Sequence, residues 1–121
     1  MTFVAVEGQD TPIGSVSIVE HDMPDRQDLR DLAPWIAGTF VVRAHRGQGV
    51  GGALMHHAIA EASRIGVPEL FLYTSSARWF YERRGWTVLR EDDFYEGEPV
   101  TIMKHRCSHD ERLAQPFGQS D

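Results

Sequence analysis

Hydrophobic residues alternate with polar ones in two stretches at the start of the chain, which predicts a β-hairpin. These stretches run over Thr2–Val6 and Pro12–Glu20, with a glycine-containing turn between them. A third apolar stretch over Pro34–Val42 predicts a strand in which Gly38 marks a bulge or a close backbone approach. The intervening segment, His21–Asp31, is highly charged, so we expect an exposed loop there.

The second half of the chain opens with a helical pattern. From Val50 to Ile65 apolar residues recur every three or four positions, and Gly66 supplies a stop signal. Leu70–Tyr73 is a continuous apolar run, as expected of a central strand covered on both faces. Three shorter elements follow, namely a helix over Ala77–Arg84 that Ser75 or Ser76 caps, and strands over Trp86–Leu89 and Val100–Met103.

The order of these elements is β-β-β-α-β-α-β-β. The long helix joins two strands that we expect to run parallel, whereas the other strands are free to pair antiparallel. The pattern therefore predicts an α/β (α+β) fold, a mixed and mostly antiparallel β-sheet with helices packed on it. With 121 residues the chain has room for one core, so we expect a single domain over 1–106 and a polar, flexible tail over 107–121.

Charge and cysteine content narrow the classes of function. Lys and Arg number 12 against 18 Asp and Glu, and the net charge of −6 disfavours nucleic acid as a partner and favours a cationic substrate. Cys107 is the only cysteine, so no internal disulfide forms and a reducing compartment is expected. The N-terminus lacks the features of a signal peptide, and no apolar run reaches the roughly 18 residues of a membrane span. These features predict a cytoplasmic protein without a membrane partner.

Glycines follow a basic turn where the third strand meets the long helix. The segment Arg43-Ala44-His45-Arg46 runs into Gly47-Gln48-Gly49-Val50-Gly51-Gly52, which gathers backbone N–H groups and a helix N-terminus at one point. Such a point suits a phosphate-bearing ligand. The spacing fits a dinucleotide fingerprint, but a hairpin precedes it and no acid ends the next strand; a Walker loop is excluded because no Lys-Ser or Lys-Thr follows. A glycine-rich connection without a ligand stays open as the alternative.

These residues make the chain similar to the GNAT superfamily of N-acyltransferases. Arg46–Gly51 matches the family signature of Arg or Gln, two residues, Gly, one residue, and Gly or Ala. Ala77–Trp86, with an aromatic-Tyr-Glu segment before Gly-aromatic, resembles the second landmark of the family, and Glu98–Met103 resembles its closing strand. The resemblance implies an N-acetyltransferase that moves an acetyl group from acetyl-CoA directly to an amine-bearing small molecule or peptide.

The resemblance also implies roles for individual residues. The pantetheine arm is expected against backbone groups of Thr39, Phe40 and Val41, in a gap where the third strand splays from its neighbour. Tyr81 stands where many family members carry the tyrosine that protonates the departing thiolate, although a core aromatic is the competing interpretation. The CoA phosphates are expected at the glycine loop, against Arg43, Arg46, Gly47, Gln48, Gly49, Val50 and Gly51.

Proton transfer is the least defined part of the expected mechanism. A thiol has a pKa of about 8.5 and a tyrosine about 10, so Tyr81 needs a lowered pKa or acts mainly by hydrogen-bonding the thiolate. Acidic residues in loops or at strand ends are candidates for the general base and are equally readable as surface charge: Glu20, Asp22, Asp92, Asp93 and Glu96. The six histidines show no metal-ligand spacing, so no metal is expected.

The chain begins where the family has its first hairpin, without the strand and two helices that usually precede it. Those elements normally wall one side of the acceptor site, so we expect either an open site or a wall supplied by a second subunit. An uncovered sheet edge at Met1–Val6 favours a homodimer. A non-catalytic acyl-CoA-binding or sensor module is the alternative function.

Overall fold

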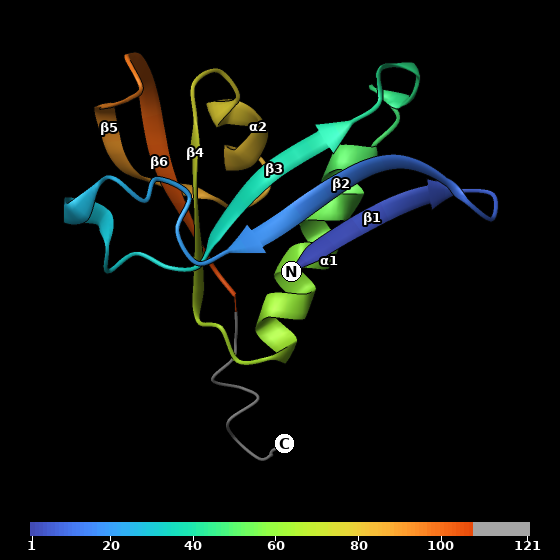
Figure 1. The fold of residues 1–121 in the computed structure, drawn as a ribbon, viewed down its shortest axis with the longest axis horizontal. Coiled ribbons are helices and arrows are strands. Elements are labelled where there is room, and N and C mark those ends of the chain that lie inside the picture. Colours follow the sequence, from blue (N-terminus) through green and yellow to red (C-terminus); the bar gives the residue numbers. More distant parts are fainter. Residues whose placement is uncertain (108–121) are drawn as a thin grey trace.

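The computed structural model describes residues 1–107, with the backbone alone at Asp92. Apart from Cys107, the predicted tail lies outside the described residues. Six strands form one sheet in the order β1-β2-β3-β4-β6-β5, and the predicted sequence of elements is confirmed (Figure 1). The strands are β1 (Thr2–Glu7), β2 (Thr11–Val19), β3 (Trp35–Val41), β4 (Glu69–Thr74), β5 (Thr87–Tyr95) and β6 (Glu98–Arg106), and the helices are α1 (Val50–Arg64) and α2 (Arg78–Glu82).

The central parallel pair of the sheet is splayed. Strands β3 and β4 pair only where Trp35 lies beside Phe71, and from there they diverge (Figure 1). All other neighbouring strands pair antiparallel. The predicted irregularity at Gly38 is present, and its φ is 64°. Between the pairs Ser15–Phe40 and Ser17–Ala37, β3 has two residues where β2 has one. The bulge bends β3 away from β4, so the backbone of its last residues lacks a neighbour on the β4 side.

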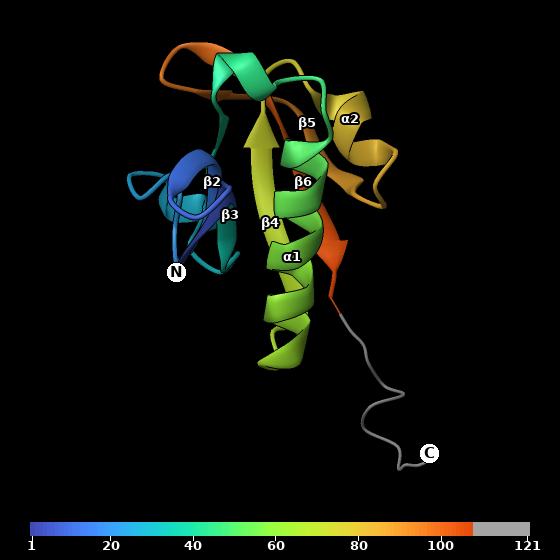
Figure 2. The same cartoon turned by 90° about the vertical axis from the view of Figure 1, so that its right-hand side faces the viewer.

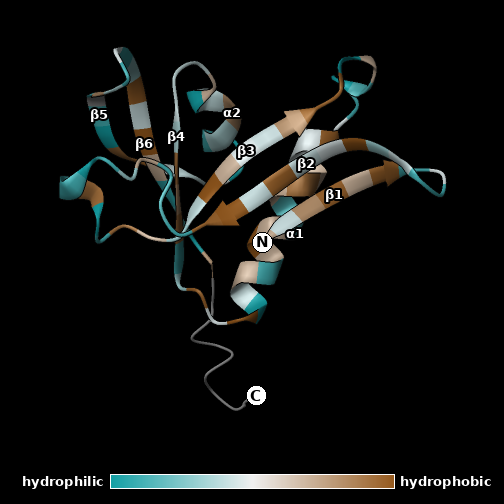
Figure 3. Cartoon of the chain, in the orientation of Figure 1, coloured by the Kyte–Doolittle hydropathy of each residue, from teal (hydrophilic) through white to brown (hydrophobic). Residues whose placement is uncertain are grey.

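Both helices lie on one face of the sheet (Figure 2). The apolar stripe of α1, with Leu54, Met55, Ala58 and Ala62, packs against the inward side chains of the strands. Hydrophobic residues gather along β1, β2 and β3, whereas the turn between β1 and β2 is hydrophilic (Figure 3). This is the half-buried alternation that the sequence pattern predicts.

The opposite face carries a second core under the β2–β3 connection. Met23 and Leu29 of this connection are only 3% and 2% exposed, and they pack with Trp35, Phe71 and Ile102. Trp35 Nε1 donates a hydrogen bond to Leu32 O over 2.6 Å, which fixes the end of the connection. The prediction of a simple exposed loop is therefore wrong in part, because a short 3-10 helix over Gln27–Leu29 turns these apolar side chains inward.

Three local predictions also need correction. The predicted cap by Ser75 or Ser76 is wrong, because Ala77 is the N-cap of α2 and has no side-chain cap; Thr74 Oγ1 instead accepts a hydrogen bond from Ala77 N over 3.0 Å, just before the helix. The strand predicted over Trp86–Leu89 begins one residue later and continues to Tyr95, pairing with β6 along the acidic segment. Cys107, predicted as the first residue of the tail, is buried in the core, and its N–H donates to Pro68 O over 2.8 Å.

Candidate functional site

A cavity of about 650 Å³ lies between the end of β3, the glycine loop and α2, and we call it the basic cavity. It brings together nine of the eleven predicted site residues; Arg43 and Gln48 are not among those that line it. The nine are Thr39, Phe40, Val41, Arg46, Gly47, Gly49, Val50, Gly51 and Tyr81, and the rest of the wall is His45, Gly52, Ala77, Phe80, Arg83 and Arg84. Segments far apart in the sequence thus meet where β3 and β4 diverge.

The glycine loop presents free backbone donors to the basic cavity. Gly47 and Gly49 have φ values of 82° and 86°, a left-handed conformation that residues with a Cβ rarely adopt. Gly49 is the N-cap of α1 and supplies no capping side chain. Within residues 1–107, the N–H groups of Val50, Gly51 and Gly52 have no backbone acceptor, and the first helical bond runs from Ala53 N to Gly49 O over 3.0 Å. Together with the helix dipole, these donors form an anion site.

The walls of the basic cavity carry one sign of charge. His45, Arg46, Arg83 and Arg84 line it, and none of its 15 lining residues is Asp or Glu. In a chain of net charge −6, such segregation focuses a positive potential on one pocket. The sequence interpretation missed Arg83 and Arg84, which follow directly after α2. Each stands four positions after an aromatic residue of α2, so the spacing places Arg83 beside Trp79 and Arg84 beside Phe80.

Two arginines are fixed around the loop by hydrogen bonds to the backbone. Arg46 Nε donates to Val41 O over 2.9 Å, which ties the loop back to the end of β3. Arg84 Nη1 donates to Phe80 O over 2.9 Å, and its guanidinium lies 3.8 Å from the centre of the Phe80 ring. A Cβ at Gly52 would lie 3.1 Å from Arg84 Nη2, so this glycine lets the guanidinium approach α1.

Tyr81 lies in an aromatic setting. Its ring contacts Phe80 and Trp86 edge-on, with centroids 5.0 and 6.0 Å away. Burial raises the pKa of Tyr81 above 10, although Arg84 opposes this shift. Of the two roles left open by the sequence, the raised pKa favours a neutral hydroxyl that donates a hydrogen bond over a tyrosine of lowered pKa.

The candidate bases differ sharply in their surroundings. Asp93 is paired with Arg26 over 3.1 Å, and this hydrogen-bonded pair lowers the pKa of its carboxyl. Half-burial raises the pKa of Asp22 to about 6, which suits a group that accepts a proton near neutral pH. Glu20 and Glu96 are exposed, and the side chain of Asp92 is not described. None of the four described candidates lines the basic cavity, so the structure places none of them as a base beside Tyr81.

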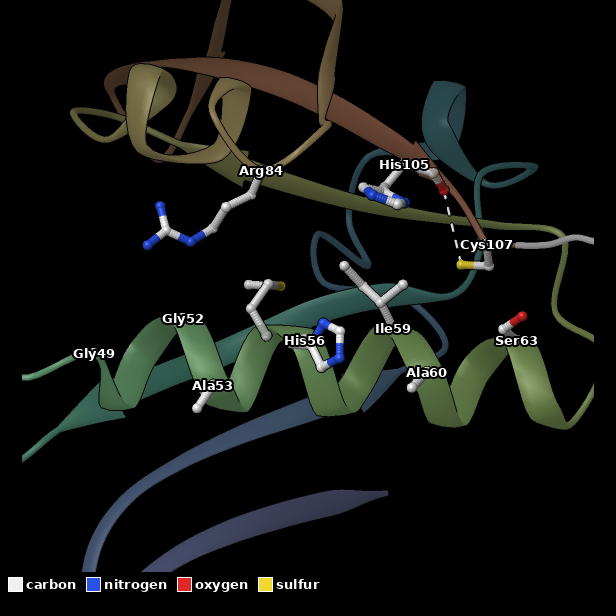
Figure 4. Close-up of a pocket in the computed structure, with 11 residues that line it drawn as sticks. Gly49, Gly52, Ala53, His56, Ile59, Ala60, Ser63, Arg84, His105 and Cys107 are labelled. Atoms are coloured by element: carbon white, nitrogen blue, oxygen red, sulfur yellow. Dashed lines mark hydrogen bonds between the residues drawn. The ribbon is translucent and has the colours of Figure 1, made fainter.

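A second cavity of about 610 Å³ adjoins the first along α1 and shares Gly49, Gly52 and Arg84 with it. Figure 4 shows Arg84 above the first turn of α1, with His105 and Cys107 of the opposite wall farther along the helix. The His105 ring packs on Trp86, 5.3 Å between centroids. Burial raises the pKa of the Cys107 thiol to about 11, so this cysteine stays protonated and is a poor nucleophile.

Neither a metal-ligand cluster nor a helix able to span a membrane is found among residues 1–107. No three His, Cys, Asp or Glu side chains of this part of the chain come together to hold a metal ion. None of the helices described is long and apolar enough to span a bilayer.

Comparison with solved structures identifies proteins of the same fold. A provisionally assigned N-acetyltransferase from Lactobacillus plantarum superimposes with a TM-score of 0.75 at 23% identity, over 88% of this chain and 68% of that one. A GNAT family N-acetyltransferase from Escherichia coli, in complex with CoA, gives 0.68 at 22% identity, over 88% and 58%. N-acetylglutamate synthase from Neisseria gonorrhoeae, complexed with coenzyme A and N-acetyl-glutamate, gives 0.65 at 21%, over 85% and 25%.

The chain therefore spans about two thirds or less of the length of these three proteins. The model of the acetyltransferase (GNAT) domain matches residues 1–88, which include the whole glycine loop, α1 and α2. The chain belongs to the GNAT acetyltransferase family.

Proposed function

We propose that the protein is an N-acetyltransferase that transfers an acetyl group from acetyl-CoA directly to an amine acceptor. The observation that carries this proposal is the composition of the basic cavity. The N–H groups at the N-terminus of α1, which have no backbone acceptor within residues 1–107, share one space of about 650 Å³ with three arginines and Tyr81. No carboxylate lines this space. Such a site fits a long ligand with phosphates at one end and a thioester at the other.

In the proposed complex, the N–H groups of Gln48–Gly51 bind the pyrophosphate of CoA, and Arg46 and Arg43 add charge nearby. The pantetheine arm runs along Thr39, Phe40 and Val41, where β3 has left β4 and its backbone is free on that side. One N–H of this segment polarises the thioester carbonyl. Loss of one such donor typically costs about 3 kcal/mol of transition-state stabilisation.

The reaction needs no covalent intermediate on the protein. The neutral amine attacks the thioester carbon, the C–S bond breaks, and the amine nitrogen loses a proton to a base. Tyr81 donates a hydrogen bond to the sulfur as its negative charge develops, and the thiolate finally takes up a proton to leave as CoA. The high pKa of Tyr81 suits this role because the hydroxyl stays neutral at physiological pH.

Calorimetric titration with acetyl-CoA and with CoA tests the proposal. We expect micromolar binding by the wild type, and a loss of at least about tenfold in Arg46→Ala and Gly49→Ala, because both changes disturb the phosphate-binding loop. Gly97→Ala is the matched control, since Gly97 has a φ of 83° in the β5–β6 turn away from the basic cavity. Equal affinity in the wild type and both loop variants would contradict the proposal.

Turnover separates the enzyme from the alternative of a non-catalytic acyl-CoA sensor. We expect release of free thiol from acetyl-CoA in the presence of a suitable small amine or peptide. Binding without thiol release across polyamines, aminoglycosides, peptide N-termini and lysine peptides would favour the sensor.

The proposal extends to assembly and compartment. We propose a cytoplasmic homodimer that forms through β1, the outer strand of the β1–β2 hairpin at the edge of the sheet. Cys107 is a free, buried thiol, as suits a reducing compartment, and β1 exposes Met1, Val4 and Val6.

A further inference from the structure

The three arginines of the basic cavity are held in different ways. Arg46 and Arg84 are each fixed by a hydrogen bond to a backbone carbonyl, as described above. Arg83 lines the same cavity, yet within residues 1–107 its guanidinium has neither a hydrogen bond nor a carboxylate partner. Its N–H groups are free to bind an anion.

Trp79 holds Arg83 in place. The Arg83 guanidinium carbon lies 4.5 Å from the centre of the Trp79 ring, and this tryptophan is 61% exposed. Stacking uses the flat face of a guanidinium and leaves its edge, with the N–H donors, open for a bidentate contact. Glu82 does not neutralise Arg83, because it is paired with Arg78 over 3.0 Å.

Arg83 and Arg84 are neighbours in sequence but point to different parts of the site. Arg84 reaches the first turn of α1 at Gly52 and borders both cavities (Figure 4). Arg83 borders only the basic cavity and turns toward the exposed Trp79. The structure thus offers one anion position at the N-terminus of α1. Arg83, beside the exposed Trp79, offers a second one at the rim of the basic cavity.

Coenzyme A carries two separate anionic groups that match these positions. Its pyrophosphate lies in the middle of the molecule, and its 3′-phosphate lies on the ribose at the adenosine end. Resting on the function proposed above, we propose that Arg83, held by Trp79, binds the 3′-phosphate and makes the site selective for CoA over dephospho-CoA. Both donors share the pantetheine arm and the pyrophosphate, so only the rim position distinguishes them.

Calorimetry with CoA and dephospho-CoA at low ionic strength tests this assignment. We expect the wild type to bind CoA about tenfold more tightly, and 0.5 M salt to shrink this ratio. Arg83→Gln should bring the ratio to about two or less by weakening CoA alone, with dephospho-CoA affinity unchanged. Trp79→Ala should lower the ratio in the same direction, because the guanidinium is then less well placed.

Arg64→Gln is the matched control, since it removes an arginine that is already paired with Glu61 over 2.8 Å and that lines neither cavity. We expect this variant to keep the wild-type ratio. Equal affinities of the wild type for the two ligands would overturn the assignment, and so would an Arg83→Gln variant that weakens both ligands alike. In either case the proposed acetyl-CoA site would stand; a wild type that binds neither ligand would overturn both.

Discussion

At the scale of single residues, Tyr81 packs against Phe80 and Trp86, and its burial keeps the hydroxyl neutral and able to donate a hydrogen bond. We expect Tyr81→Phe to lower kcat about 10- to 100-fold while the Kd for acetyl-CoA stays within about twofold. A hydrogen bond to a charged group contributes roughly 1.5–3 kcal/mol, and the lost hydroxyl donates only once the thiolate forms. Steady-state kinetics and calorimetry measure the two quantities.

The pH profile offers an independent check on the same residue. Because burial raises the pKa of Tyr81 above its ordinary value, ionisation of its hydroxyl should cause no fall in kcat across the neutral pH range. Tyr95→Phe, on β5 and outside the basic cavity, is the control and should keep wild-type turnover. An unchanged kcat in Tyr81→Phe would return Tyr81 to the role of a core aromatic.

Asp22 gives a residue-level prediction on stability. Its pKa is raised from 3.8 to about 6, so the folded state binds the proton more tightly than the unfolded chain does. The favourable contribution is present below pH 3.8 and is lost as pH rises through about 6. We therefore expect Asp22→Asn to be more stable than the wild type by about 1 kcal/mol at pH 7.5, allowing for the partial exposure of this side chain, and about equal to it at pH 3.8.

Urea unfolding at the two pH values measures this difference. Asp31→Asn, which neutralises an exposed aspartate in the same connection, is the control. A stability difference for Asp22→Asn that is the same at both pH values would contradict a raised pKa.

At the scale of elements, the β2–β3 connection takes the place of a covering layer on the second face of the sheet. Arg26 anchors it through Asp28 at 2.8 Å, Asp93 at 3.1 Å and the carbonyl of Phe94 at 2.9 Å. We expect Arg26→Ala to destabilise the fold by about 1–2 kcal/mol, since it removes the side-chain donor of the Phe94 carbonyl and the Arg26 partner of Asp93. Hydrogen exchange should rise most in residues 20–34.

The same anchor predicts a pH dependence. Arg26 lowers the pKa of Asp93, so the stability that it contributes is present above the usual aspartate pKa and is lost as pH falls below it. The difference in unfolding free energy between the wild type and Arg26→Ala should therefore become smaller at acidic pH. Arg30→Ala is the control, because among the described residues its guanidinium hydrogen-bonds only to Gln27 of the same turn. Equal exchange rates in both variants would show that the connection does not depend on Arg26.

The elements predicted well from sequence are those whose signals are local. The stripe of α1, the apolar run of β4 and the glycines with positive φ each appear within a few neighbouring residues, and so do the signature residues of the basic cavity. The burial of Met23 and Leu29 has no such signal, because they pack against Phe71 and Ile102, which lie far along the chain. Likewise, the acidic end of β5 forms a strand because β6 pairs with it, against its own propensity.

Arg83 and Arg84 were missed for a related reason. On an amphipathic helix, arginines are usually solvated surface charge, and α2 has only five residues with which to show a face. Their value to the site comes from tertiary placement, where α2 stands opposite the first turn of α1. The glycine loop could be predicted from the sequence alone, whereas the arginines beside it are found only from the fold.

At the scale of the whole molecule, the open sheet has two edges with different chemistry. The outer strand β5 carries the run Arg90-Glu91-Asp92-Asp93, and charges of this kind protect an edge from pairing with another chain. The other edge, β1, has the sequence Thr-Phe-Val-Ala-Val-Glu, without a basic residue or a proline. A groove of about 510 Å³ between β1 and α1 lies beside it, lined mostly by apolar residues. The geometry therefore favours self-association at β1.

A lysine introduced on β1 in one variant and on β5 in another tests whether self-association depends on the β1 edge. We expect the wild type to sediment as a dimer of 13.7 kDa chains, and Val4→Lys to sediment as a monomer, because antiparallel pairing of two β1 strands would bring the introduced lysines together. Phe94→Lys is the matched control, since Phe94 on β5 is 59% exposed, much as Val4 is at 54%. It should leave the dimer intact. Because Val4 is 54% exposed and is not part of the hydrophobic core, the folded monomer should survive the change. Thermal unfolding at low concentration then separates lost pairing from lost folding, and a monomeric wild type, or equal masses for both variants, would rule out β1 as the interface.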